Sequence, residues 1–252
     1  MAVKEFNSSQ LIKPNIPDYA CIISDKLYFG NQTFAKKHKE LKELGITLII
    51  DLINYKPGKE TQHSPDFKYI NKPVIDLPSS NIDFCEELSL EIDKELKEKN
   101  KKVYVHCAQG ISRSATLIIY YIMTREKKNF KNTLNLVRSL RSVVCPTTGF
   151  IECLSELDKK LFGQYSLTKE DYSIECLKFN FQYLKENEIK KFYDESKEIV
   201  KNNVNELIKR LGKNKLENID QVGFLTYELL KEKYKDKGIN YRYGCSEQHP
   251  FN

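Results

Sequence analysis

The sequence predicts an α/β fold, with a layered domain built on a largely parallel sheet and a mainly helical C-terminal extension. Short apolar segments rich in β-branched residues alternate with longer segments whose apolar residues recur every three or four positions. Strands that alternate with helices in this way are typical of parallel sheets covered by helices. Near Gly163 the alternation stops and helical spacing takes over, so residues 165–252 are predicted to form the extension.

The first predicted elements are two short strands, a helix and a buried strand. Residues 20–30 hold two short apolar segments around Ser24-Asp25, which predicts a strand pair joined by a turn. Phe34–Leu44 has helical spacing, and Gly45 follows where helices commonly end in a glycine. Ile46–Leu52 is a continuous apolar run, as expected of a strand buried on both faces.

The following segments continue this order. Phe67–Asp76 alternates between apolar and polar residues and predicts a strand, and apolar residues four positions apart predict an amphipathic helix over 84–99. Lys102–Cys107 predicts a strand that leads through a loop into a helix, Arg113–Arg125. Two further helices are predicted at about 130–141 and 149–162.

The extension is predicted to be helical for a different reason at each end. Thr168 and Asp171 have the spacing of a capping box, which starts a helix. Apolar residues between Ile189 and Leu211 recur at helical spacing. Residues 176–184 conflict with this pattern because apolar and polar residues alternate there as in a strand, so their class stays open.

The composition predicts a soluble chain in a reducing compartment. No apolar run approaches the roughly 18 residues of a membrane span. The 7 cysteines are odd in number and contain no CxxC pair, which argues against a disulfide framework or a zinc ribbon and for a cytoplasmic or nuclear location. The net charge of +6 suits an anionic substrate, but the lysines are too scattered to predict nucleic-acid binding.

The segment from His106 to Ser114 (HCAQGISRS) has the pattern of an anion-binding loop. Its backbone N–H groups and the N-terminus of the following helix are expected to bind a phosphate. Arg113 adds a planar fork that can hold two phosphate oxygens. Gly110 allows the tight turn. The predicted phosphate-binding residues are Ala108, Gln109, Gly110, Ile111, Ser112 and Arg113.

The same segment carries a predicted nucleophile. In the positive field of the loop, Cys107 is expected to be present as the thiolate. Ser114 is placed to donate a hydrogen bond to that sulfur and ease its departure in a second step. His106 is expected to hold the loop by hydrogen bonding rather than to transfer a proton.

Attack on a phosphate ester also needs an acid for the leaving oxygen. The candidates near the predicted strand ends are Asp51, Asp76 and Asp83. We interpret Asp51 as structural because it lies in an apolar strand. Asp76 begins a turn-rich segment after a strand and is placed to reach the loop, although local sequence alone does not decide for it.

Val103–Ser114 resembles the active-site signature of the dual-specificity subgroup of cysteine-dependent protein phosphatases, including MAP-kinase phosphatases and atypical members. The resemblance covers about residues 15–163, and further matching segments are Leu27–Asn31, Gly45–Thr47, Val74–Pro78, Ser112–Thr116, Val137-Arg138, Arg141 and Gly149-Phe150. It implies an αβα-layered cysteine-phosphatase fold. It also makes Asp76 the acid, because the family's acid stands about 31 residues before the cysteine, as Asp76 does here.

The resemblance further implies the reaction and its substrates. It predicts hydrolysis of phosphotyrosine and of phosphoserine or phosphothreonine in proteins, a protein kinase being one candidate substrate. The reaction would pass through a cysteinyl-phosphate and need no metal or other cofactor. Gln109 and Thr147 depart from residues common in the family, which leaves the substrate preference open.

Other functions remain to be weighed. A phosphatase for an inositol lipid, a phosphoglucan or an RNA 5′ end is disfavoured because the loop contains no lysine and the chain no tryptophan. A non-catalytic phosphoresidue-binding module is disfavoured because both Cys107 and Asp76 are present. The extension, in turn, is a candidate adaptor for a partner.

Three kinds of secondary site were also considered. Arg138 and Arg141 are interpreted as surface salt-bridging residues rather than contacts to a second phosphate. Burial is favoured over a resolving-thiol role for Cys85, Cys145 and Cys153. Cys245 and His249 are too few to predict a zinc site.

Overall fold

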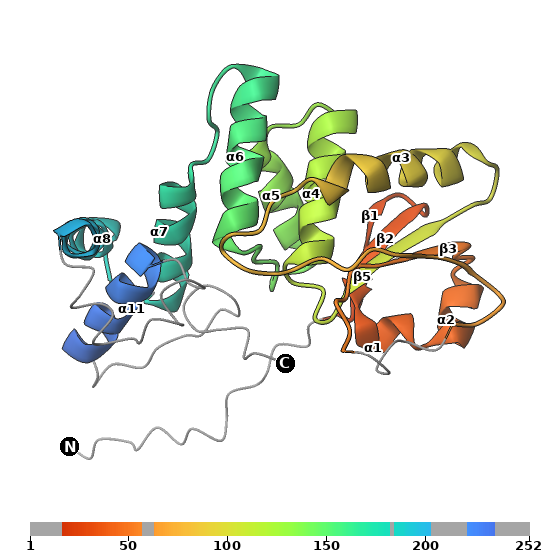
Figure 1. The fold of residues 1–252 in the computed structure, drawn as a ribbon, viewed down its shortest axis with the longest axis horizontal. Coiled ribbons are helices and arrows are strands. Elements are labelled where there is room, and N and C mark those ends of the chain that lie inside the picture. The colour runs from red at the N-terminus through yellow and green to blue at the C-terminus, as the bar shows by residue number, and fades with distance from the viewer. Residues whose placement is uncertain (1–16, 57–62, 182–183, 203–220, 235–252) are drawn as a thin grey trace, which may run out of the picture.

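Figure 1 shows the computed structural model of the chain, which describes residues 17–56, 63–181, 184–202 and 221–234. Its centre is a five-stranded sheet in the order β1-β2-β5-β3-β4. The strands are β1 (Tyr19–Ile23), β2 (Leu27–Asn31), β3 (Leu48–Asp51), β4 (Lys68–Asn71) and β5 (Val103–Cys107). Only β1 runs antiparallel to its neighbour, and the other pairs are parallel.

Helices cover both faces of this sheet (Figure 1). They are α1 (Gln32–Ala35), α2 (His38–Glu43), α3 (Phe84–Lys97), α4 (Arg113–Arg125), α5 (Phe130–Leu140) and α6 (Thr148–Phe162). On one face α1 and α2 share a hydrophobic cluster with Tyr104 of β5. On the other face α3 to α6 share a larger cluster with Val103 and Val105. Because successive side chains of a strand point to opposite faces, β5 supports both layers, and the layered α/β arrangement is confirmed.

Two predicted elements differ from the structure. The single helix expected over Phe34–Leu44 is divided into α1 and α2, because the chain leaves helical geometry at Lys37, with φ −88° and ψ 69°. The strand expected over Phe67–Asp76 is limited to β4. Pro73, which has no N–H to donate to a neighbouring strand, follows soon after. Asp76 therefore lies in the loop between β4 and α3.

The extension contains three described helices, α7 (Lys169–Asn180), α8 (Glu186–Asn202) and α11 (Gln221–Lys233). The predicted capping box is present at the start of α7, where the side chains of Thr168 and Asp171 each accept a backbone N–H of the other residue. The predicted helical run over 189–211 is observed in α8, and its remainder lies outside the described residues.

The segment whose class stayed open, 176–184, is helical as far as Asn180. Its sequence pattern misleads because α7 is buried on two sides and has no single apolar stripe. Tyr172 and Cys176 belong to the main core of the sheet domain. A second group faces α8 and α11: Ile174, Leu177 and Phe181.

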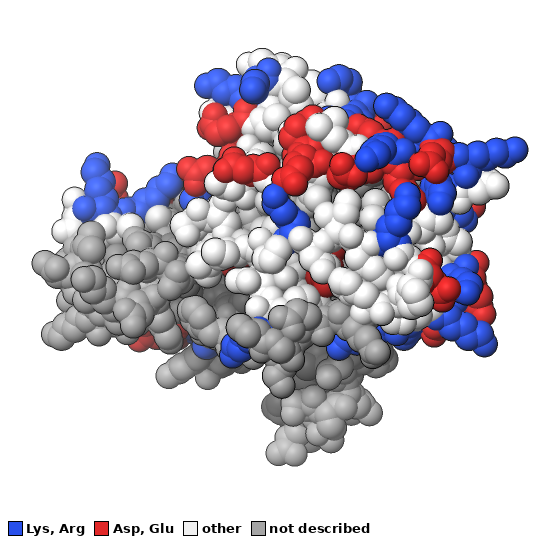
Figure 2. Space-filling view, turned by 45° about the vertical axis from the view of Figure 1, so that its right-hand side comes forward, with Lys and Arg blue, Asp and Glu red and all other residues white. Residues whose placement is uncertain are grey.

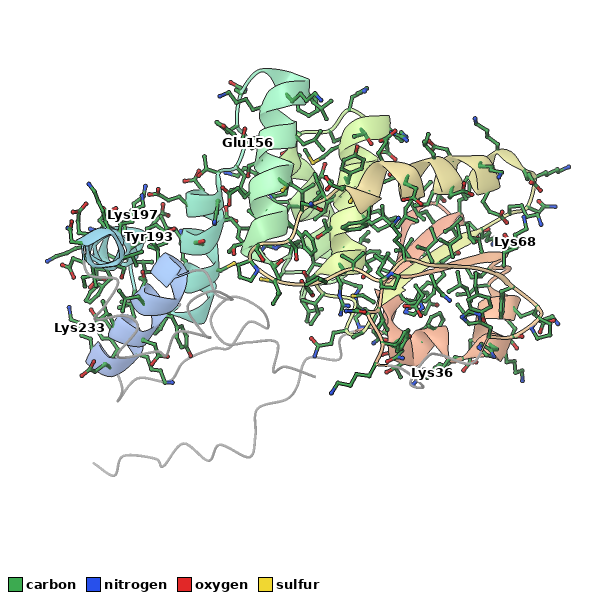
Figure 3. All side chains as sticks on the ribbon, in the orientation of Figure 1. Lys36, Lys68, Glu156, Tyr193, Lys197 and Lys233 are labelled. Atoms are coloured by element: carbon green, nitrogen blue, oxygen red, sulfur yellow. The ribbon has the colours of Figure 1, made fainter. Side chains whose placement is uncertain are left out.

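Helix α8 continues this second cluster away from the sheet. Tyr193 is buried within the cluster, and Lys197, one turn later, forms an ion pair with Glu170 of α7 (Figure 3). The extension therefore packs onto the sheet domain through α7, while α8 and α11 pack mainly on α7 and on each other.

The surface carries charges of both signs. On the face shown in Figure 2, basic and acidic side chains are intermixed over the upper part of the molecule, and a largely uncharged area lies below them. Among the helices in the described ranges, none is long and apolar enough to cross a membrane.

Candidate active site

The candidate site lies where the central strand β5 ends. Parallel strands place their carboxyl ends at one edge of a sheet, and this is where α/β proteins commonly bind ligands. Cys107 is the last residue of β5 and is 2% exposed. The chain then forms the loop 108–112 and enters α4 at Arg113, so the predicted order of strand, loop and helix is present.

The carbonyl groups of this loop accept hydrogen bonds from residues on its outer side. The N–H of Gln32 donates to the carbonyl of Ala108 at 3.1 Å, and the N–H of Cys145 donates to that of Ile111 at 3.0 Å. The carbonyls of Gln109 and Gly110 accept from the guanidinium of Arg141, at 3.2 and 3.4 Å.

These outer bonds decide where the loop amides point. In a planar trans peptide the N–H points opposite to the preceding carbonyl. The N–H groups that follow these four carbonyls, those of residues 109–112, are therefore turned toward the inside of the loop. Successive inward amides at a helix N-terminus can bind an anion, which is the cradle that the sequence predicts.

Gly110 is required for this loop shape. Its φ is +67°, in the region that residues with a Cβ rarely adopt. A Cβ at this position would lie 2.4 Å from the carbonyl carbon of Gly30, at the end of β2. The loop is thus packed directly against the backbone of the neighbouring strand.

Arg141 corrects one sequence interpretation. It was expected at the surface, yet it is only 2% exposed and is among the largest fully buried side chains. Besides the two loop carbonyls, it donates to the carbonyl of Pro17. Its guanidinium therefore fixes the loop on the outer side, opposite to the inward amides. Nothing in the local sequence distinguishes it from an exposed arginine, because its partners lie in distant segments.

Arg138 was also expected at the surface and is likewise enclosed. Its Nε donates to the carbonyl of Val144 at 3.1 Å, and its guanidinium lies 5.1 Å from the ring centre of Tyr172. It also pairs with Glu175 at 3.5 Å. Its side chain thus connects α5 to the extension.

Ser114 lies beside the thiol, as the sequence predicts. Its Oγ is 3.4 Å from Sγ of Cys107 and also 3.4 Å from the carbonyl oxygen of Gly30. Both side chains are buried. A thiolate at Cys107 would accept a hydrogen bond from the Ser114 hydroxyl.

Asp76 reaches the loop from the β4–α3 connection. Its Oδ1 accepts a hydrogen bond from Oγ of Ser112 at 2.7 Å, and its Oδ2 lies 3.4 Å from Nε of Arg113. Nη1 of Arg113 donates hydrogen bonds to the carbonyl oxygens of Leu52 and Val74, at 3.3 and 3.4 Å. The structure thus brings Asp76 and Arg113 together beside the loop that begins at Cys107.

Sequence reasoning did not single out the side chain of Ser112. Besides donating to Asp76, its hydroxyl accepts the backbone N–H of Thr147 at 3.1 Å. Thr147 directly precedes α6, and its own hydroxyl donates to the carbonyl of Leu77 at 3.4 Å. Ser112 therefore joins the phosphate loop, the Asp76 loop and the start of α6.

The other two acids have local partners. Asp83 precedes α3 and accepts a hydrogen bond from the amide of Asn81 at 2.6 Å. Asp51 is 3% exposed and accepts from the N–H of Ile53 at 2.9 Å and the hydroxyl of Tyr55 at 2.8 Å. These contacts agree with the structural interpretation of Asp51.

His106 is buried between Asp51 and its own backbone. Its Nε2 lies 3.6 Å from Oδ2 of Asp51. Burial lowers the pKa of His106 below its ordinary value, while the Asp51 carboxylate and the backbone of Cys107 act in the opposite direction. Burial thus disfavours the protonated form of the imidazole next to Cys107. Within the described ranges, no group of three or more His, Cys, Asp or Glu side chains is arranged to hold a metal ion.

Comparisons with known proteins agree with this geometry. The family model for the dual specificity phosphatase catalytic domain matches residues 27–160. The chain is 30% identical over 142 residues to dual specificity protein phosphatase 14 of Homo sapiens, an alignment that covers 56% of this chain and 70% of that protein. It is 32% identical over 147 residues to dual specificity protein phosphatase PHS1 of Arabidopsis thaliana. That alignment covers 58% of this chain but only 16% of the plant protein.

Two solved structures share the fold. The human tyrosine phosphatase-like serine/threonine/tyrosine-interacting protein matches with a TM-score of 0.52 and 30% identity, over 56% of this chain and 96% of that one. Human DUSP28 matches in fold with a TM-score of 0.51 and 23% identity, over 57% of this chain and 95% of that one. The family model ends at residue 160, before the extension begins.

Proposed function

Because the chain belongs to the dual specificity phosphatase family, we propose that it hydrolyses phosphotyrosine and phosphoserine or phosphothreonine in proteins through a cysteinyl-phosphate. The observation that carries this proposal is the convergence of one thiol, one guanidinium and one carboxyl group on a loop whose amides turn inward. Cys107 and Arg113 lie at the two ends of one loop, and Asp76 comes from the distant connection between β4 and α3. Each is oriented by contacts to backbone or to another site residue.

The substrate phosphate is expected to bind in the loop 108–112. The inward amides and the N-terminus of α4 donate hydrogen bonds to its oxygens, and Arg113 binds two of them through its fork. Nε of Arg113 also lies 3.4 Å from Oδ2 of Asp76, so the guanidinium lies between the proposed phosphate site and the proposed acid.

The first displacement forms a bond between Sγ of Cys107 and phosphorus while the bond from phosphorus to the ester oxygen breaks. Asp76 gives its proton to the departing oxygen. The loop amides and Arg113 stabilise the charge on the three phosphoryl oxygens in the transition state.

The second displacement returns the enzyme to its starting state. A water oxygen attacks phosphorus, its proton passes to the carboxylate of Asp76, and the bond between phosphorus and sulfur breaks. Ser114 donates a hydrogen bond to the departing thiolate, a role supported by the 3.4 Å separation of its Oγ from Sγ. His106 takes no proton in this scheme and keeps the end of β5 in place beside Asp51.

We propose the domain limits and the cellular setting on the same grounds. Residues 15–163 form the catalytic domain, and residues 165–252 form an extension to it. A cytoplasmic or nuclear location is supported by the six cysteines of the described ranges, all of which are free thiols. Phosphoproteins, among them protein kinases, are the proposed substrates, rather than nucleic acids.

The experiment that tests this proposal is hydrolysis of p-nitrophenyl phosphate by the full chain under reducing conditions, with and without EDTA. We expect turnover that resists EDTA and disappears in Cys107→Ser, while Cys21→Ser, a cysteine on the edge strand β1, keeps wild-type turnover. Activity that survives in Cys107→Ser would overturn the nucleophile. A folded but inactive wild-type protein would instead favour a phosphoresidue-binding function.

A further inference from the structure

The loop that carries the phosphate site is supported by a short segment between α5 and α6. This bridging segment, residues 144–147, touches both halves of the site. Through Cys145 it donates to the carbonyl of Ile111, and through Thr147 it donates to the hydroxyl of Ser112, which in turn donates to Asp76. The position of the bridging segment therefore affects the phosphate loop and the acid together.

The loop that bears Asp76 rests on the residues just after this segment. A Cβ on Gly149 would lie 2.4 Å from the carbonyl oxygen of Pro78. The hydroxyl of Thr147 donates to the neighbouring carbonyl of Leu77. The first turn of α6 and the acid loop are thus in direct backbone contact, and a shift of one displaces the other.

The bridging segment is in turn held by one residue of the extension. The hydroxyl of Tyr172 on α7 donates to the carbonyl of Pro146 at 3.0 Å and lies 3.0 Å from Sγ of Cys145. Tyr172 is 2% exposed. Arg138, which lies over its ring, bonds the carbonyl of Val144.

Tyr172 lies outside the part of the chain that matches the family model, which ends at residue 160. Figure 1 shows α7 running beside α6, on the side away from the sheet. Yet Tyr172 is part of the main hydrophobic cluster that includes Cys107 and Ile111. The extension thus contributes a buried hydroxyl to the support of the site.

We propose that Tyr172 is a positioning residue that fixes the bridging segment and, through Thr147 and Ser112, the orientation of Asp76. On this view the extension is a structural part of the catalytic unit and not a separate appendage. The proposal rests on the proposed phosphatase function for its kinetic consequence, but the hydrogen-bonded connection itself can be tested without turnover.

The decisive variant is Tyr172→Phe in the full chain, which removes one hydroxyl and keeps the ring. A displaced acid should matter most where the leaving group is poor. We expect kcat/KM for phenyl phosphate to fall about tenfold, and kcat/KM for p-nitrophenyl phosphate to fall much less. A merely structural defect would lower both values equally, so an equal loss, or none, overturns the proposal.

The matched control is Tyr165→Phe. Tyr165 also lies in the extension, but it is 40% exposed and its hydroxyl bonds to Glu156 on the outer side of α6 (Figure 3). This variant should keep wild-type kinetics with both substrates. If Tyr172→Phe does not fold, as judged by circular dichroism, Arg138→Met removes the other support of the segment and should give the same leaving-group pattern.

A second measurement separates this proposal from the proposed function. Amide hydrogen exchange of Cys145 and Thr147 reports directly on the two hydrogen bonds that these backbone amides donate to Ile111 and Ser112 of the loop. Exchange at both amides should accelerate in Tyr172→Phe and not in Tyr165→Phe. Unchanged exchange would overturn the positioning role even in an active enzyme, whereas an inactive wild type with accelerated exchange in the variant would refute only the phosphatase assignment.

Discussion

Nε of Arg113 lies 3.4 Å from Oδ2 of Asp76, and both side chains are mostly enclosed, at 14% and 11% exposure. The residue proposed to bind phosphate and the residue proposed to donate the proton are therefore in contact with each other. Their contact is reinforced by Ser112, which bonds the other carboxylate oxygen. Arg113, Asp76 and Ser112 thus form one connected group beside the loop.

The first prediction concerns this carboxyl group. Asp76→Asn keeps the size of the side chain but cannot donate a proton to the leaving oxygen. We expect kcat/KM to fall by about 100-fold or more for phenyl phosphate, and less for p-nitrophenyl phosphate, whose leaving group needs little assistance. Steady-state kinetics on the two substrates measure this difference.

Asp83→Asn is the matched control for that variant, because Asp83 lies at the start of α3 and bonds Asn81 instead of a loop residue. It should keep wild-type kinetics. A larger loss in Asp83→Asn than in Asp76→Asn would reassign the acid. Inorganic tungstate, which needs no acid, should bind Asp76→Asn at least as well as wild type because a carboxylate near the anion site is gone.

The second prediction concerns the shape of the loop. Gly110→Ala places a Cβ within 2.4 Å of the Gly30 backbone at a φ of +67°. Since neither backbone can yield without moving the strand end, the loop must shift, and we expect activity to fall by more than 100-fold. Gly163→Ala is the control, because its φ is +79° but nothing lies within 4 Å of the added Cβ. That variant should lose about 1 kcal/mol of unfolding free energy and keep its activity, and equal kinetics in the two variants would argue against the packing of the loop.

The third prediction concerns Arg141. Arg141→Met keeps much of the buried volume but leaves the carbonyls of Pro17, Gln109 and Gly110 without their donor. We expect the free energy of unfolding in urea to fall by about 3 kcal/mol, together with a loss of turnover. Arg125→Met, which removes a partly exposed guanidinium paired with Glu86 and Asp93, should cost about 1 kcal/mol or less. A stable, active Arg141→Met protein would mean that the loop keeps its shape without this support.

Local sequence predicts the centre of this molecule well. The strand ending at Cys107, the loop and the helix starting at Arg113 are contiguous in sequence. Their arrangement can therefore be predicted from residues that are close neighbours in the chain. The proposed general acid was harder to predict, because Asp76 reaches the loop across a long connection, and the choice rested on family resemblance. The strand predicted to run up to Asp76 was too long.

What the sequence could not predict are contacts made by residues distant from the loop. Arginine is usually a surface residue, so the sequence gives no reason to expect Arg141 to be buried. It is buried because the carbonyl groups of Gln109, Gly110 and Pro17 accept its hydrogen bonds. The C-terminal half of helix α7 was not predicted from the sequence for a related reason. Tyr172 faces the sheet domain and Leu177 faces α8 and α11, so the helix has apolar residues on two sides and its periodicity is lost.

The last prediction follows from the burial of His106. Burial lowers the pKa of its imidazole below the ordinary value of about 6.5. In the unfolded chain the same side chain binds a proton once the pH falls below about 6.5, whereas in the folded chain it stays neutral until a lower pH. Protons therefore favour the unfolded state in this window, and the free energy of unfolding should decrease as the pH falls from 7.5 to 5.5. Carboxyl groups whose pKa is lowered, such as Glu95, change the free energy of unfolding only as the pH falls below their ordinary pKa of 4.5.

Urea unfolding at several pH values measures how the free energy of unfolding changes with pH. This slope should flatten in His106→Asn and persist in His63→Asn. A wild-type protein equally stable at both ends of this range would show that His106 binds a proton as readily in the folded chain as in the unfolded chain.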